Sequence, residues 1–201
     1  MPSHSAKSLF DQNVTSAESC LTLYLGLKKM ATTLDISWLL RASIVFSISA
    51  LDAYFHDKVK FRAGHSDLND MPPAMADFEI PLRELISWED AKRKGNVFRN
   101  WFSNYFATRP LQRKEDIASA LKIVGINELW ATIEPDTPKR NVFLDQFSSY
   151  VTRRNQIAHE GDRLAHRNSA KKLRPINEKY VQDCIKFSID LVQKIEKAFP
   201  K

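Results

Sequence analysis

Three polar side chains in the last quarter of the chain have the types and the spacing to act together. Asn155 and His159 are four residues apart, so on a helix they share one face, and the long side chain of Arg154 can reach the same place. Histidine exchanges protons near neutral pH, whereas arginine stays charged and can bind phosphate oxygens through two hydrogen bonds. Gly161 is the usual residue type for ending a helix, which places His159 in the last, accessible turn. The pattern predicts a site that binds phosphate and transfers protons.

Ordinary structural roles are the alternative for these residues. His159 could hydrogen-bond the last carbonyl groups of its helix, and Arg154 could form a surface ion pair with Glu160 or Asp162. Arg153 is a second candidate for the functional arginine. It ranks lower because Asn155 does not follow it directly.

The segment Arg154-Asn-Gln-Ile-Ala-His-Glu160 resembles the R-x4-H signature of the HEPN superfamily, and especially its RiboL-PSP branch. Residues Ser49 to Lys58 resemble the long early helix of these proteins, and the overall similarity extends from Phe10 to Phe199. The resemblance implies an all-α fold. The expected architecture is a HEPN-type helical bundle with an up-and-down four-helix core and extra short helices.

The same resemblance implies a metal-independent endoribonuclease of the toxin or defence type. Such cleavage needs a base for the 2'-hydroxyl proton, an acid for the departing 5'-oxygen and a cation that holds the phosphate. HEPN ribonucleases pair two motifs across a dimer, so a chain with one motif is expected to form a homodimer with a composite cleft. His159 would transfer protons, Arg154 would hold the phosphate, and Asn155 would orient His159 or hold the phosphate. The toxin type also implies an antitoxin protein as a partner.

Asp52 is an acidic residue inside an apolar segment, where a carboxylate is costly unless it is paired. The resemblance implies that this residue faces Arg154 and belongs to the catalytic set. The alternative is a position at the edge of the bundle with His56 or Lys58 nearby. Asp52 and His56 are one helical turn apart, but two ligands without a third form a weak metal pattern. No metal and no other cofactor is expected.

The segment 163–174 follows the motif and contains no acidic residue. We expect this basic connector to bind the phosphate backbone of RNA beside the cleft. The side chains expected to bind RNA are Arg153, Arg163, Arg167, Lys171 and Lys172.

Composition indicates one globular domain over residues 1–201. The chain is 43% hydrophobic and 27% charged, and its five glycines argue against a β-fold rich in tight turns. A net charge of +6 favours a polyanionic partner. Cys20 and Cys184 lie on apolar helix faces and are expected to be reduced core thiols. Together with the absence of a secretory pattern at the N-terminus, this predicts a cytoplasmic protein without membrane contact.

Hydrophobic periodicity and helix-ending residues predict the elements that position the motif. The helix opened by Asp35 is apolar nearly all round and should be central. Residues 62–79 read as a long loop, and the aromatic residues of 97–107 are interpreted as core packing rather than as a surface that stacks on RNA. The motif helix should open with Thr137 as its cap and bury Val142 among its core residues. The helices are expected at 8–29, 35–61, 81–94, 97–107, 114–126, from 137 through the motif, and from 175 onward.

Two other functions remain open. One is a HEPN module that binds RNA or a nucleotide without catalysis, and the other is a helical dimerisation domain. The endoribonuclease requires His159. The binding module requires the basic connector but tolerates the loss of His159, and the dimerisation domain tolerates the loss of both.

Overall fold

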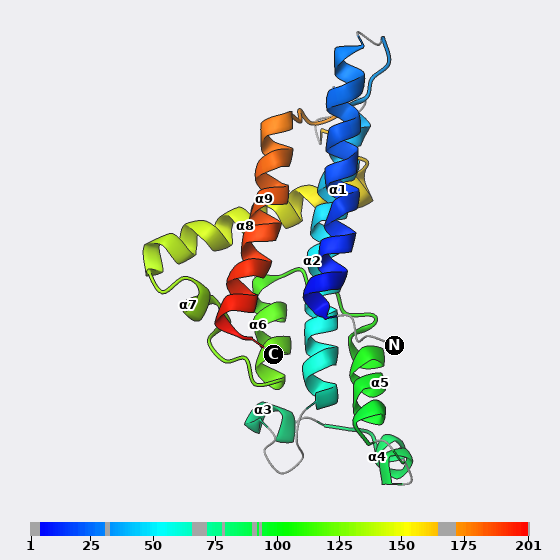
Figure 1. Cartoon of the computed structure of the whole chain (residues 1–201), viewed down its shortest axis with the longest axis vertical. Coiled ribbons are helices and arrows are strands. Elements are labelled where there is room, and N and C mark those ends of the chain that lie inside the picture. The colour runs from blue at the N-terminus through cyan, green and yellow to red at the C-terminus, as the bar shows by residue number, and fades with distance from the viewer. Residues whose placement is uncertain are drawn as a thin grey trace.

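The structure is a computed structural model that describes residues 5–30, 33–65, 72–77, 79–89, 92, 94–164 and 172–200. Over these residues the chain folds into helices joined by loops, with one isolated antiparallel bridge between Arg163 and Leu173. The all-α expectation is confirmed. In chain order the helices are α1 (Ala6–Lys29), α2 (Ser37–His65), α3 (Pro73–Ala76), α4 (Leu82–Glu89), α5 (Lys94–Phe106), α6 (Lys114–Ile123), α7 (Leu129–Ile133), α8 (Thr137–Glu160) and α9 (Glu178–Ala198) (Figure 1).

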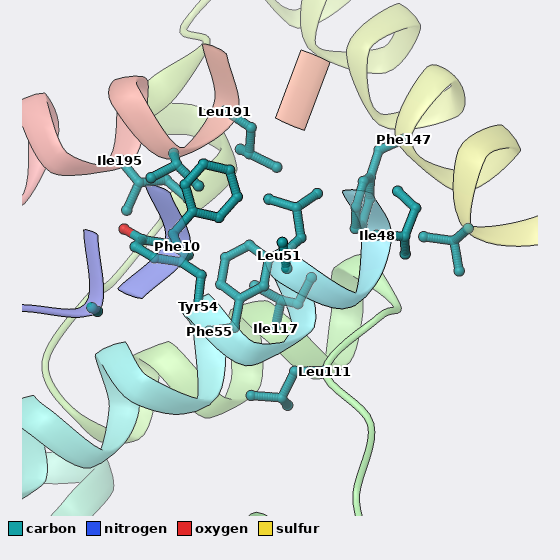
Figure 2. Close-up of a cluster of buried hydrophobic side chains, with 14 of the residues drawn as sticks. Phe10, Ile48, Leu51, Tyr54, Phe55, Leu111, Ile117, Phe147, Leu191 and Ile195 are labelled. Carbon is teal, nitrogen blue, oxygen red and sulfur yellow. The ribbon is translucent and has the colours of Figure 1, made fainter. Parts of the chain in front are cut away.

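Helix α2 is the centre of the bundle, as its apolar sequence predicted. It contacts α1, α5, α6, α8 and α9. Its most apolar 18-residue window has a mean hydropathy of 1.3, high enough for a membrane span, but 61% of that window is buried inside the bundle. In Figure 2, side chains from α1, α6, α8 and α9, together with Leu111 from the loop before α6, meet those of α2. The labelled core residues are Phe10, Ile48, Leu51, Tyr54, Phe55, Leu111, Ile117, Phe147, Leu191 and Ile195.

The start of α2 agrees with the sequence, whereas its end lies further along the chain than expected. The carboxylate of Asp35 accepts the backbone N–H of Ser37, the first residue of the helix, at 2.9 Å, so Asp35 stabilises the helix start from one residue before the expected cap position. The helix continues to His65 because Ala63 is buried in the core and Arg62 donates to the carbonyl of Pro200. The predicted loop over 62–79 therefore starts later and contains α3, while residues 66–71 and 78 lie outside the described part.

Helix α8 crosses α9 and α2 in Figure 1, and its first turns extend beyond them. This geometry explains why Val142, expected in the core, is 68% exposed. The buried face begins two residues later and consists of Leu144, Phe147, Tyr150 and Val151. The cap is Asp136, which accepts the backbone N–H of Lys139, so it lies one residue before the expected Thr137.

Two further sequence expectations concern apolar residues. In α5, Trp101 and Phe106 are buried, as predicted for core aromatic residues. Burial raises the pKa of the Cys184 thiol to about 12, so this core thiol stays protonated at neutral pH. Cys20 is half-buried and, like Cys184, is not part of a disulfide.

The short helix α7 was not predicted, because five residues are too few for a hydrophobic period to be recognised.

Candidate functional site

A cleft of about 870 Å³ lies where α2, α8 and the start of α6 meet. Its lining includes the four residues that were predicted from the sequence to be catalytic. These are Asp52 from α2 and Arg154, Asn155 and His159 from α8. Residues 110–116 supply much of the remaining surface. Asn155 and His159 share the cleft because their four-residue spacing places them on one helix face, and the long side chain of Arg154 reaches it from the neighbouring position.

Arg154 has hydrogen-bonding capacity left for a ligand. Its Nη1 donates to the side-chain oxygen of Asn155 at 3.1 Å, and its Nε is buried without a partner in the described structure. Glu160 and Asp162, the two acids proposed as structural partners for Arg154, pair with other arginines. A buried guanidinium nitrogen without an acceptor is energetically costly, and an incoming anion would relieve that cost.

His159 is exposed in the last turn of α8, at the position that the sequence indicated. The left-handed Gly161 ends the helix with a φ of 62°, and the backbone N–H groups of Gly161 and Asp162 both donate to the carbonyl of Gln156. The helix is therefore capped by its own backbone, in the way typical of a glycine stop. Its end does not depend on the imidazole of His159, which is left accessible from the cleft.

Asp52 has other partners than Arg154. Its Oδ1 accepts the backbone N–H of Leu111 at 2.7 Å, its Oδ2 accepts Nε2 of Gln112 at 3.1 Å, and Nε2 of His56 lies 3.5 Å from Oδ1. Burial acts to raise the pKa of Asp52, but the hydrogen bonds from His56, Gln112 and Leu111 outweigh it and lower the pKa below its usual value. Asp52 is thus a carboxylate at neutral pH. The alternative expectation, in which His56 rather than Arg154 lies near Asp52, was therefore correct.

Lys58, the second bundle-edge candidate, does not pair with Asp52. Lys58 is buried and pairs with Glu196 at 2.8 Å. Within the described residues, no three histidine, cysteine or acidic side chains are grouped as metal ligands.

Arg153 lies in a buried ion cluster rather than on an open surface. Its Nη1 is 2.8 Å from Oδ1 of Asp162, whose Oδ2 also accepts Nε of Arg41 at 2.6 Å. The same two arginines donate to the carbonyl of Arg174, and Arg153 also donates to that of Pro175. Burial lowers the pKa of Arg153, against the opposing effect of Asp162. Arg153 was expected to bind RNA, but its guanidinium is engaged inside the protein.

Only a weak signal for this cluster is present in the sequence. Asp162 follows the helix-ending glycine and is 1% exposed, and Arg41 interrupts an apolar run. A charge that is buried in this way needs a partner of opposite sign. Nothing in the local pattern connects two residues 121 positions apart.

The buried cluster leads to a prediction about stability. Asp162→Ala leaves two mostly buried arginines without their counter-charge and is expected to lower the free energy of unfolding by about 3–5 kcal/mol. Urea denaturation of the parent and the variant measures this difference. Asp190→Ala is the control, because Asp190 forms an exposed pair with Lys186 that should matter little. Equal losses in the two variants would contradict a structural role for the cluster.

The basic connector is tied to the end of α8. Leu164 donates to the carbonyl of Lys172 at 3.0 Å, and the N–H of Arg174 donates to the carbonyl of Asp162 at 2.8 Å. Arg163 and Lys172 are both exposed. Arg167 and Lys171 lie outside the described residues. The two ends of the connector therefore meet directly after the motif helix.

Comparison with known proteins places this fold and motif in a family. The family model described as RiboL-PSP-HEPN matches residues 13–200, which is nearly the whole chain and includes both α2 and the motif of α8. No curated protein and no solved structure matches the chain. The chain belongs to the RiboL-PSP-HEPN family.

Proposed function

We propose that this protein is a metal-independent endoribonuclease of the toxin or defence type. The observation that supports it most directly is the cleft in which Arg154, Asn155 and His159 lie together, with one buried nitrogen of Arg154 left without an acceptor. The family assignment agrees with a nuclease or a nucleotide-binding module. Ribonuclease activity is the function that uses both the proton carrier and the phosphate-binding cation.

The proposed reaction is attack by the RNA chain on its own backbone. A base removes the 2'-hydroxyl proton, the 2'-oxygen forms a bond to the neighbouring phosphorus, and the bond to the 5'-oxygen of the next nucleotide breaks. An acid returns a proton to that departing oxygen. Arg154 holds the phosphate while negative charge builds on its oxygens, and Asn155 holds the guanidinium of Arg154 in place. The products are a 2',3'-cyclic phosphate and a 5'-hydroxyl.

Two proton-transfer groups are needed, and one chain offers one motif histidine. We therefore propose a cytoplasmic homodimer in which His159 of each protomer serves as base or acid for one shared cleft. The exposure of His159 at the end of α8 supports this arrangement, because a second copy can approach it. RNA is the proposed substrate, with an antitoxin protein as the proposed partner that controls activity. The exposed Arg163 and Lys172 would add salt-dependent affinity for the RNA backbone.

Cleavage is expected to persist in excess EDTA and to leave 2',3'-cyclic phosphate ends. The reason is that the neighbouring hydroxyl is the nucleophile, so neither a metal-bound water nor any other water is needed for the first step. The test is digestion of a labelled single-stranded RNA after chelation, with the ends identified by mass spectrometry. Cleavage that appears only with added Mg²⁺ or Mn²⁺, or that leaves 5'-phosphate ends, would contradict the proposal.

A HEPN module that binds RNA without cutting it is the second candidate. It is favoured by the absence of a hydrogen bond to the His159 imidazole anywhere in the described structure, since a catalytic histidine is normally oriented by a second group. The parent protein distinguishes the two functions. Salt-dependent RNA binding without cleavage, equal in the parent and in His159→Ala, would support the binding module.

A further inference from the structure

One part of the cleft lining comes from the loop that enters α6. This second wall consists of residues 110–114, and the sequence pattern had given it no function. Pro110, Gln112, Arg113 and Lys114 all line the cleft. Leu111 lies between them with its side chain in the core, 2% exposed.

The second wall is fixed at two points. At its start, both carboxylate oxygens of Asp52 are hydrogen-bonded to it, one to the backbone of Leu111 and the other to the side chain of Gln112. At its end, the indole nitrogen of Trp130 donates to the carbonyl of Lys114 at 3.0 Å. Hydrogen bonds to an ionised group are the stronger kind. The backbone that carries Arg113 is therefore held in place before any ligand arrives.

Arg113 is the positively charged residue of the second wall that can bind a ligand. It is exposed, it lines the cleft, and in the described part of the chain it forms no ion pair. Lys114 has its ammonium 3.9 Å from the carboxylate of Glu115. Glu115 and Asp116 also line the cleft in the first turn of α6. Their negative charges confine any attraction for phosphate to the Arg113 end of the wall.

We propose that Asp52 is a positioning residue that holds the second wall, and that Arg113 on this wall binds a phosphate of the RNA next to the one bound by Arg154. The proposal rests on the function proposed above and extends it to the length of RNA that the cleft recognises. Asp52 does not touch substrate in this arrangement, because its oxygens are already occupied by Leu111, Gln112 and His56. Its importance comes from Arg113, the residue that directly follows its partners Leu111 and Gln112 in the wall.

The experiment compares two substrates. A single-stranded oligonucleotide has a phosphate for Arg113, whereas a dinucleoside monophosphate has only the phosphate that is cut. Arg113→Ala should lower the ratio of kcat/KM between oligonucleotide and dinucleoside by about tenfold, mostly through KM, as expected for one lost charged contact. Lys139→Ala removes an equal charge outside the cleft and should leave the ratio unchanged.

Asp52→Ala should reproduce the effect of Arg113→Ala although it leaves Arg113 in place. Asp52→Asn, which retains an oxygen for the N–H of Leu111, should restore part of the ratio. The double variant should be little worse than either single variant, because both act through the same contact. If Asp52→Ala does not fold, Gln112→Ala removes one of the two anchors without altering α2 and should give a smaller effect in the same direction.

Binding measured in a His159→Ala background separates this inference from the proposed function. In that background, Arg113→Ala should reduce the slope of log affinity against log salt by roughly 0.7, the value for one phosphate of a single strand. An unchanged slope in a protein whose parent cuts RNA would overturn the inference alone. A parent that does not cut RNA, but whose slope falls as expected, would overturn the ribonuclease proposal alone. A loss of kcat on the dinucleoside in Asp52→Ala, with KM unchanged, would show instead that Asp52 acts in the chemistry.

Discussion

His159→Ala is expected to reduce RNA cleavage by about a hundredfold to ten-thousandfold, which is the range for loss of a general acid or base. The imidazole is the only proton carrier of the motif, and alanine has no group that can replace it. The fold should remain intact, because His159 is exposed and the end of α8 is capped by backbone bonds to Gln156. The measurement is the single-turnover rate on a labelled RNA, together with the melting temperature.

The control for this substitution lies on the same helix. Asp145 is exposed on α8 and does not line the cleft, so Asp145→Ala should cut RNA at the rate of the parent. Mixing the parent protein with an excess of His159→Ala protomers adds a test of the composite site, because each mixed dimer lacks one of the two proton-transfer groups. A cleavage rate per parent protomer that falls in the mixture supports a cleft shared between two copies. Parental activity in His159→Ala by itself would exclude the catalytic role of this histidine.

Arg154→Ala is expected to reduce cleavage by about a hundredfold to a thousandfold, the cost of removing one group that stabilises transition-state charge. Arg154→Lys should recover little of this loss. A lysine ammonium is a point charge and does not reproduce the two parallel hydrogen bonds that a guanidinium makes to phosphate oxygens. Lysine also lacks the second nitrogen that lets Arg154 donate to Asn155 and still offer a donor to the cleft.

Arg140→Lys provides the matched control for Arg154→Lys. Arg140 is also on α8, but it donates to Glu134 and Thr137 and does not line the cleft. The same single-turnover assay should show parental rates for this variant. Rates in Arg154→Lys close to those of the parent would show that a positive charge is sufficient, and the proposed bidentate contact would then be wrong.

The α8 residues of the site were predictable from the sequence because their arrangement is local. A separation of four residues puts Asn155 and His159 on one helix face in any α-helix, and a glycine after them is the residue best able to adopt the left-handed turn that ends it. The central place of α2 followed from its composition, since a helix that is apolar nearly all round has to be surrounded. Family membership followed from the same motif and the early helix, and the match over residues 13–200 confirmed it.

Which arginine faces the cleft was decided by the tertiary structure. Neighbouring helix residues point roughly 100° apart, so Arg153 and Arg154 cannot share one environment. The packing of α8 on the bundle turned Arg153 toward Arg41 and Asp162 and left Arg154 facing the cleft. The partners of Asp52 could not be predicted from the sequence either, since Leu111 and Gln112 are 59 and 60 positions away along the chain. A charged residue in an apolar segment predicts that a partner exists, because burying an unpaired charge is costly. Which residue is that partner is determined only by the folded chain.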